Sequence, residues 1–135
     1  MPDSLLPKPF SLQDAKLKNP LALAYLGDTV WDLLIRQRLL LGGLPAGALH
    51  RRAILLANAG AQAQAAARME PHLTQEEADV LRRGQNAHAH HRAPKNQDPV
   101  AYSRATGLEA LMGYLYLTGQ TGRIAELFDI GAPIL

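Results

Sequence analysis

Two acidic residues stand alone within apolar stretches of this 135-residue chain. Asp28 follows Gly27 in the run LALAYLGDTVWDLLIRQRLLL, and Glu109 precedes Gly113 by four residues in LEALMGYL. A glycine inside a helix costs about 1 kcal/mol relative to alanine, and a carboxylate on an apolar face needs hydrogen-bonding partners or a cation. Because neither feature favours stability, we interpret both as functional. We predict that Asp28 and Glu109 face each other across a pair of helices and hold a divalent cation.

The chemistry open to such a pair is that of a hard cation. Helical proteins build sites for such ions from Asp and Glu side chains on neighbouring helices. Magnesium keeps several waters and needs only one or two protein carboxylates besides substrate phosphates, and it can activate water and polarise a phosphoryl oxygen. The pattern alone leaves a second interpretation open, in which each acid is an isolated core residue satisfied by backbone amides or by an arginine.

The segment from residue 82 to residue 104 is basic, with five Lys or Arg residues against the single acid Asp98, although the net charge of the chain is only +2. A local basic patch on a nearly neutral protein favours binding of a polyanion there, and a solvated basic loop is the alternative. The candidate phosphate contacts are Arg82, Arg83, Asn86, Arg92, Lys95, Asn96 and Arg104. The same segment contains His88, His90 and His91, whose spacing matches no standard zinc site.

The composition excludes several classes of protein. The chain has no cysteine, which rules out disulfides and thiolate metal sites and suits a reducing compartment, so we expect a cytoplasmic protein. No apolar run approaches the roughly 18 residues of a membrane span, so we expect no membrane partner. The sequence contains no glycine-rich phosphate loop, GxSxG motif or HExxH motif.

The spacing of apolar residues predicts an all-α fold without strands. We expect an N-terminal arm with one short helix over residues 1–20 and a single helical domain over residues 21–135. In that domain the predicted helices span residues 20–41, 46–69, 75–87, 99–118 and 121–131. Helix starts are indicated by the capping residues Ser11, Asn19, Thr74 and Asp98. On the central helix, Val30, Trp31 and Leu34 belong either to the core or to a contact with a partner.

Four segments resemble, in order, those of ribonuclease III catalytic domains. LALAYLGD, which ends at Asp28, resembles the signature helix of that family, and EALMGYL, which begins at Glu109, resembles its second catalytic helix. Leu49-His50 with the later Gln62-Ala63, and VLRRGQNA with PKN, extend the likeness over residues 21–117. The greatest similarity is to Mini-ribonuclease III, the small bacterial branch that has the catalytic domain without a double-stranded-RNA-binding domain.

This resemblance implies an all-α homodimer in which each of two active sites cuts one strand of an RNA duplex. It implies a magnesium-dependent endoribonuclease that leaves 5′-phosphate and 3′-hydroxyl ends, with Asp28 and Glu109 as catalytic residues and metal ligands. Ribonuclease III proper has two further acids, whose positions hold Ala24 and Thr106 here, and the Mini branch also lacks them. The substrate implied is the double-stranded stem of the precursor of large-subunit (23S) ribosomal RNA, and a ribosomal protein is a candidate partner.

Two other functions stay open on the sequence. A non-catalytic member of the same fold, binding structured RNA or the ribosome as a scaffold, would account for Ala24 and Thr106 but has no need of Asp28 and Glu109. An unrelated helical hydrolase of small nucleotides would account for a metal-binding pair of acids. It would not need the basic segment 82–104.

Overall fold

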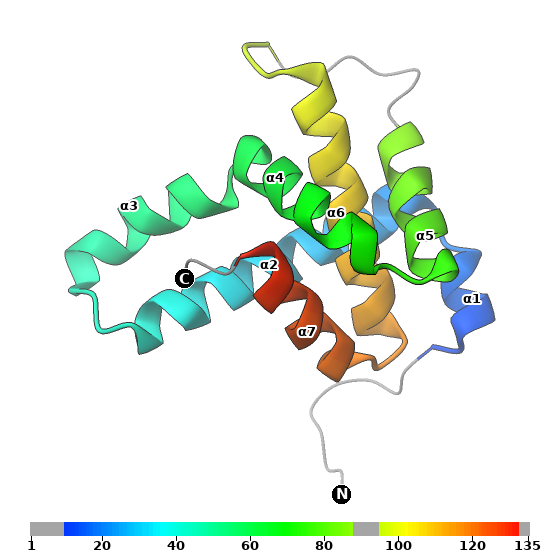
Figure 1. Cartoon of the computed structure of the whole chain (residues 1–135), viewed down its shortest axis with the longest axis horizontal. Coiled ribbons are helices and arrows are strands. Elements are labelled where there is room, and N and C mark those ends of the chain that lie inside the picture. Colours follow the sequence, from blue (N-terminus) through cyan, green and yellow to red (C-terminus); the bar gives the residue numbers. More distant parts are fainter. Residues whose placement is uncertain (1–9, 88–94, 133–135) are drawn as a thin grey trace, which may run out of the picture.

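The computed structural model describes residues 10–87 and 95–132, and every regular element in this part of the chain is helical, which confirms the predicted all-α class. In chain order the elements are α1 (Leu12–Lys16), α2 (Pro20–Leu41), α3 (Ala46–Ala57), α4 (Ala59–Met69), a 3₁₀ turn (Glu70–His72), α5 (Gln75–Asn86), α6 (Pro99–Leu117) and α7 (Thr121–Gly131) (Figure 1). Among the described residues, no helix combines the length and the apolar character that crossing a membrane requires.

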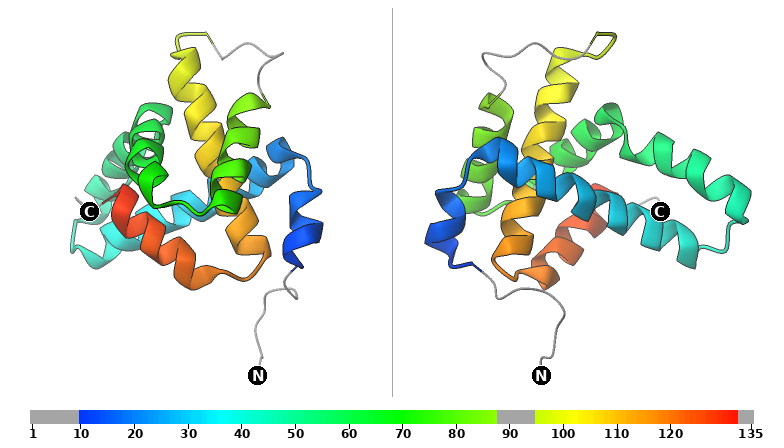
Figure 2. Two further views of the ribbon diagram at one scale, coloured as in Figure 1. Left: turned by 45° about the vertical axis from the view of Figure 1, so that its right-hand side comes forward. Right: turned by 180° about the vertical axis from the view of Figure 1, so that it is seen from behind.

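Helix α6 lies at the centre of the fold, with α2, α4 and α5 packed around it (Figures 1 and 2). Every residue of α6 from 105 to 115 except Glu109 is buried, because this stretch is apolar or small on all faces. Helix α2 contributes Trp31, which is 1% exposed and meets the ring of Phe128 edge-on, with the ring centroids 5.0 Å apart. Val30 is also buried, and Leu34 packs against the core. Val30 and Trp31 are therefore core residues, and Leu34 lies at the edge of the core.

The predicted capping residues start the helices. The side chains of Ser11, Asn19 and Asp98 each accept a hydrogen bond from a backbone N–H in the first turn of α1, α2 and α6, at 3.1, 2.8 and 3.0 Å respectively. At the start of α5, Thr74 accepts from the Glu77 backbone at 3.2 Å, and the Glu77 carboxylate accepts from the Thr74 backbone at 2.9 Å. These bonds satisfy donors that have no partner within the helix.

One prediction about the helices is wrong, because residues 46–69 form two helices that separate at Asn58. The Asn58 backbone is extended, with ψ at 168°. Its side-chain oxygen accepts from the Ala61 N–H at 2.9 Å, and its amide donates to the carbonyls of Ile54 and Leu55 at 3.3 and 3.1 Å. One side chain thus ends α3 and begins α4. Asparagine competes for backbone groups in this way, and the spacing of apolar residues does not reveal it.

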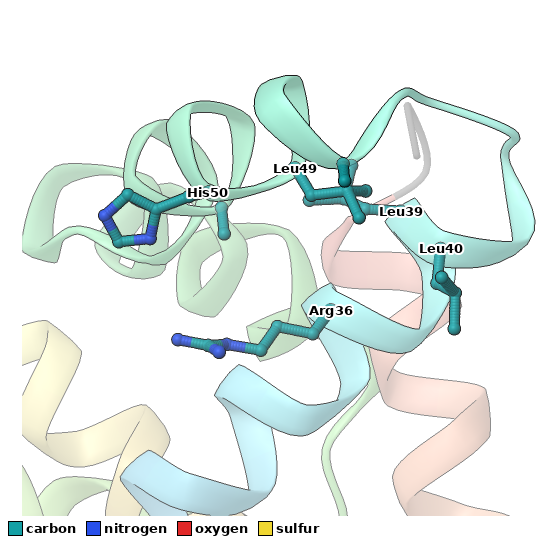
Figure 3. A pocket seen from close by; sticks show the side chains of 7 residues that line it. Arg36, Leu39, Leu40, Leu49 and His50 are labelled. Atoms are coloured by element: carbon teal, nitrogen blue, oxygen red, sulfur yellow. The ribbon is translucent and has the colours of Figure 1, made fainter.

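Helix α3 packs beside the C-terminal part of α2, and the two helices extend from the rest of the molecule as a hairpin (Figure 2). Between them is a cavity of about 300 Å³ lined by Arg36, Leu39, Leu40, Ala46, Leu49, His50 and Ala53 (Figure 3). The outer face of α2 exposes three large apolar side chains, since Tyr25, Leu33 and Leu40 are 84%, 62% and 65% exposed. Helix α2 therefore presents an apolar face that the described residues do not cover.

Candidate active site

The two predicted acids meet where α2 and α6 cross in backbone contact. A Cβ atom on Gly27 would overlap the backbone carbonyl of Glu109, and a Cβ atom on Gly113 would overlap the carbonyl of Leu23. Only glycine allows two helices to approach this closely at both points. Because Asp28 follows Gly27 directly, the crossing brings its side chain to that of Glu109. The glycines that seemed unfavourable for a helix are therefore what positions the acids.

Replacing Gly27 by alanine is expected to destabilise the chain by about 1–3 kcal/mol, because the added methyl group must displace the backbone of α6. The free energy of unfolding in urea measures this effect. Gly47→Ala is the matched control, since Gly47 lies in helix α3 and a Cβ there meets nothing within 4 Å. Equal stability of Gly27→Ala and the native chain would contradict the close crossing.

Asp28 and Glu109 form a hydrogen-bonded pair of carboxyl groups. Asp28 is exposed and Glu109 is half-buried. Burial, together with the hydrogen bond and charge of Asp28, raises the pKa of Glu109 to about 8, and a hydrogen bond with Gln62 opposes this shift. Near neutral pH Glu109 therefore retains its proton, because burial and the neighbouring carboxyl group of Asp28 both disfavour its charged form.

The donor set of this pair fits a hard divalent cation. Both groups supply carboxylate oxygens, the ligands that magnesium prefers, and their mutual repulsion is relieved by a positive charge between them. Within the described residues, no group of three or more His, Cys, Asp or Glu side chains is placed to hold a metal ion. Asp28 and Glu109 would thus be the two protein carboxylates of such a site, with water and phosphate completing it.

Gln62 is a site residue that the sequence analysis missed. It lies in α4, is only 3% exposed, and its amide nitrogen donates to the carbonyl of Ala57 at 3.3 Å. The same side chain lies within reach of the Glu109 carboxyl group and lowers its pKa as a hydrogen-bonding partner. In the sequence, a polar glutamine within an alanine-rich helix is the one sign that this position has a special role. Its neighbour Gln64, which is exposed, gives the same signal, so the sequence alone does not separate them.

Most of the predicted phosphate contacts that the structure describes are exposed: Arg82, Asn86, Lys95, Asn96 and Arg104. Asn86 ends α5, and Lys95 and Asn96 precede α6, so these three lie at the same end of the molecule (Figure 1). Arg82 pairs with Asp79 one turn earlier in α5, at 3.1 Å. Arg92 lies outside the described residues, as do His88, His90 and His91.

Arg83 differs from the other basic candidates. Its guanidinium donates to the backbone carbonyls of Lys16 and Lys18, at 2.8 and 3.4 Å, and so ties α5 to the end of α1. The Lys16 carbonyl has no donor within α1, because the last turn of a helix leaves its carbonyls unpaired. Arg83 thus has a structural role, and its contact with phosphate stays a prediction.

Residues 21–120 match the family model of the ribonuclease III domain. The chain belongs to the ribonuclease III family. It is therefore an endoribonuclease. Mini-ribonuclease 3 of Symbiobacterium thermophilum is 46% identical over 117 residues, which are 86% of this chain and 89% of that protein. Mini-ribonuclease 3 of Gloeobacter violaceus is 50% identical over 110 residues, which are 80% of each chain. These similarities confirm the resemblance to Mini-ribonuclease III.

A solved structure supports the same family. The X-ray crystal structure of protein FN1578 from Fusobacterium nucleatum superposes on this ribonuclease III domain with a TM-score of 0.77 and 28% sequence identity. The match covers 87% of this chain and 93% of that chain. The helical arrangement described above is therefore shared over nearly the whole length of both proteins.

The two positions at which ribonuclease III proper has further acids are packed in this ribonuclease III domain. Ala24 is 6% exposed and Thr106 is 5% exposed. The Thr106 hydroxyl donates to the backbone carbonyl of Tyr102 at 3.0 Å. These two positions therefore add no carboxylate to the candidate site formed by Asp28 and Glu109.

Proposed function

We propose that this chain is a magnesium-dependent endoribonuclease that cleaves double-stranded RNA through Asp28 and Glu109. The products would have 5′-phosphate and 3′-hydroxyl ends. The observation that carries the proposal is the pair of contacting carboxyl groups at the glycine crossing, one of which has a pKa raised to about 8. When bound, magnesium supplies charge stabilisation at the phosphoryl oxygens and lowers the pKa of a water molecule.

The two acids have different tasks in this proposal. Asp28 is exposed and reaches toward solvent, where the RNA backbone approaches. Glu109 is half-buried and held by Gln62, so its orientation is fixed from the protein side. The proton that Glu109 retains near neutral pH must leave before both carboxylates bind a cation, since metal ligands bind deprotonated.

The test is a cleavage assay on a long, perfect RNA duplex, with magnesium and with a chelator. Internal cuts that require magnesium, with phosphate at the new 5′ ends, are the expected result. Salt-sensitive binding of the duplex without cleavage in any divalent cation would reject this proposal. It would favour the non-catalytic scaffold, which the neutral residues Ala24 and Thr106 support.

The exposed apolar face of α2 supports a homodimer. Tyr25 and Leu40 lie eight and seven residues from Leu33, on the same outer face. A two-fold axis near Leu33 would therefore place Tyr25 of each copy beside Leu40 of the other, as an isologous interface requires. The cavity that Leu40 lines could then receive the tyrosine ring (Figure 3). Since Asp28 lies one turn beyond Tyr25, both active sites would border this interface.

Leu33→Asp is expected to convert the dimer into monomers, because two carboxylates would meet at the two-fold axis with no cation between them. Light scattering after size-exclusion chromatography measures the mass in solution. Leu17→Asp is the control, since Leu17 is 80% exposed and lies outside α2. A dimeric Leu33→Asp variant would exclude this face as the interface.

The exposed basic residues would bind RNA phosphates. A-form RNA displays phosphates and 2′-hydroxyl groups across a shallow minor groove, which a protein can recognise by shape. Lys95→Ala is expected to weaken binding of all duplexes alike and to reduce the slope of log affinity against log salt by about one. Lys18→Ala removes the same charge outside the basic segment and should leave the slope unchanged. A Lys95 effect confined to one RNA sequence would contradict phosphate contact.

The finer assignments follow the family likeness. We place the catalytic unit at residues 21–135 and the arm at residues 1–20. The natural substrate would be the stem of the precursor of large-subunit (23S) ribosomal RNA, processed in the cytoplasm with a ribosomal protein as candidate partner. The test compares cleavage of this stem with cleavage of an unrelated duplex. Cuts at the mature 5′ and 3′ ends of the stem, with random cuts in the unrelated duplex, would identify the stem as the specific substrate.

A further inference from the structure

Gln62 is a buried polar side chain whose presence packing does not explain. It lies in α4 against α6 and is only 3% exposed, and its own helix supplies mostly alanine around it. Burying an amide has a cost in free energy unless its hydrogen bonds are restored. A methionine would fill a similar volume without that requirement. The reason for an amide at this position must therefore lie in the groups to which it bonds.

The first of these groups is the backbone carbonyl of Ala57, at 3.3 Å from the Gln62 amide nitrogen. Ala57 is the last residue of α3, and carbonyls at the end of a helix have no donor within the helix. The break between α3 and α4 is itself fixed by the Asn58 side chain. The Gln62 amide is thus anchored to a defined point of the backbone.

The second group is the carboxyl of Glu109. One hydrogen of the amide serves Ala57 and the other remains for Glu109, so the orientation of the amide determines where the carboxyl group lies. A glutamate side chain has three rotatable bonds, and helix α6 alone does not restrict them to one rotamer. The chain of contacts from Ala57 through Gln62 to Glu109 supplies that restriction, and it continues to Asp28.

We propose that Gln62 is a positioning residue, which holds the Glu109 carboxylate in the orientation that binds a divalent cation together with Asp28. This proposal rests on the proposed function, since it takes the acid pair as the cation site. Partners that orient metal ligands typically change metal affinity by about 10–100-fold when they are removed. Gln64 has no such contact. It is exposed and lines a separate cavity beside Arg68, so it provides the same residue type in the same helix without the proposed role.

The experiment is a titration of the native chain and of Gln62→Met with Mn²⁺ in the absence of RNA, with free Mn²⁺ measured by electron paramagnetic resonance. We expect the dissociation constant to rise by about 10–100-fold in the variant. The magnesium concentration for half-maximal cleavage should rise by a similar factor, while the rate at saturating magnesium recovers. Gln64→Met should retain the native affinity.

Thermal melting of each variant separates positioning from packing. Weakened Mn²⁺ binding at native melting temperature supports the proposal, and a Gln62→Met chain with native affinity overturns it. If Gln62→Met does not fold, Gln62→Asn decides by the same titration, because its amide is one methylene too short to serve both partners. Asp28→Asn is titrated in parallel. If it binds Mn²⁺ as tightly as the native chain, the acid pair is not the site and the proposed function fails, independently of Gln62.

Discussion

Asp28→Asn is expected to abolish cleavage of an RNA duplex while leaving the fold and the binding of RNA intact. Asn and Asp have nearly the same shape, so the helix crossing at Gly27 is unchanged. The substitution removes one of two carboxylates, however, and the remaining Glu109 would have to hold the cation alone. Removing only a residue that orients a ligand costs about 10–100-fold, so losing a ligand itself should reduce the cleavage rate by more than about a hundredfold.

If the acid pair is the active site, the loss of cleavage should occur on replacing Asp28 and not on replacing another acid of α2. Asp32→Asn removes the same charge one turn further along α2, where Asp32 pairs with Arg36 at 2.9 Å. That variant should cleave normally. RNA affinity, measured with a chelator present, should not fall in Asp28→Asn, since a negative charge near the phosphates has been removed. Cleavage by Asp28→Asn at the native rate would end the proposed mechanism.

The sequence allows the acids to be predicted because each interrupts an otherwise apolar helix. A residue type that lowers stability at its own position is visible without a structure, and this holds for Asp28 and Glu109 and for Gly27 and Gly113 in the same helices. The caps at Asn19, Thr74 and Asp98 are equally visible, because capping depends on residues within one turn. Such local signals account for the helix starts and for the main catalytic candidates.

The features that were missed depend on contacts between distant segments. Gln62 bonds Glu109, 47 residues away in the chain, and its role follows only from the packing of α4 on α6. For Arg83 the predicted RNA contact stays a prediction, and the sequence did not reveal that its guanidinium donates to the carbonyls of Lys16 and Lys18. Charge patterns identify a surface that attracts a polyanion, and they do not show which of its cations already have partners.

Glu109 is expected to make the metal-free chain less stable as the pH rises from about 4.5 to about 8. The folded state keeps the proton of Glu109 up to about pH 8, whereas the unfolded chain releases it near 4.5. Between these values the unfolded state binds fewer protons, so the free energy of unfolding falls with rising pH. At 1.36 kcal/mol for each pH unit the total loss is up to roughly 5 kcal/mol, and above both pKa values it stays constant.

Urea unfolding with a chelator, at about pH 5.5 and about pH 8.5, measures this loss. Glu109→Gln should abolish most of it and should be more stable than the native chain at the higher pH. Glu126→Gln, an exposed substitution of the same kind in α7, should leave the pH dependence unchanged. An identical pH dependence in Glu109→Gln and the native chain would exclude a strongly raised pKa.

Magnesium should restore the stability that the chain loses as Glu109 ionises, and it should do so more strongly at high pH. A cation binds the ionised form of Glu109, so at about pH 8.5 it stabilises a charge that is already present, whereas at about pH 5.5 it must first displace a proton. The increase in unfolding free energy with magnesium should therefore be larger at the higher pH and absent in Glu109→Gln. In a cation site, the paired carboxylates destabilise the metal-free chain and stabilise the chain with bound metal. A pair of core acids with a structural role would not respond to magnesium.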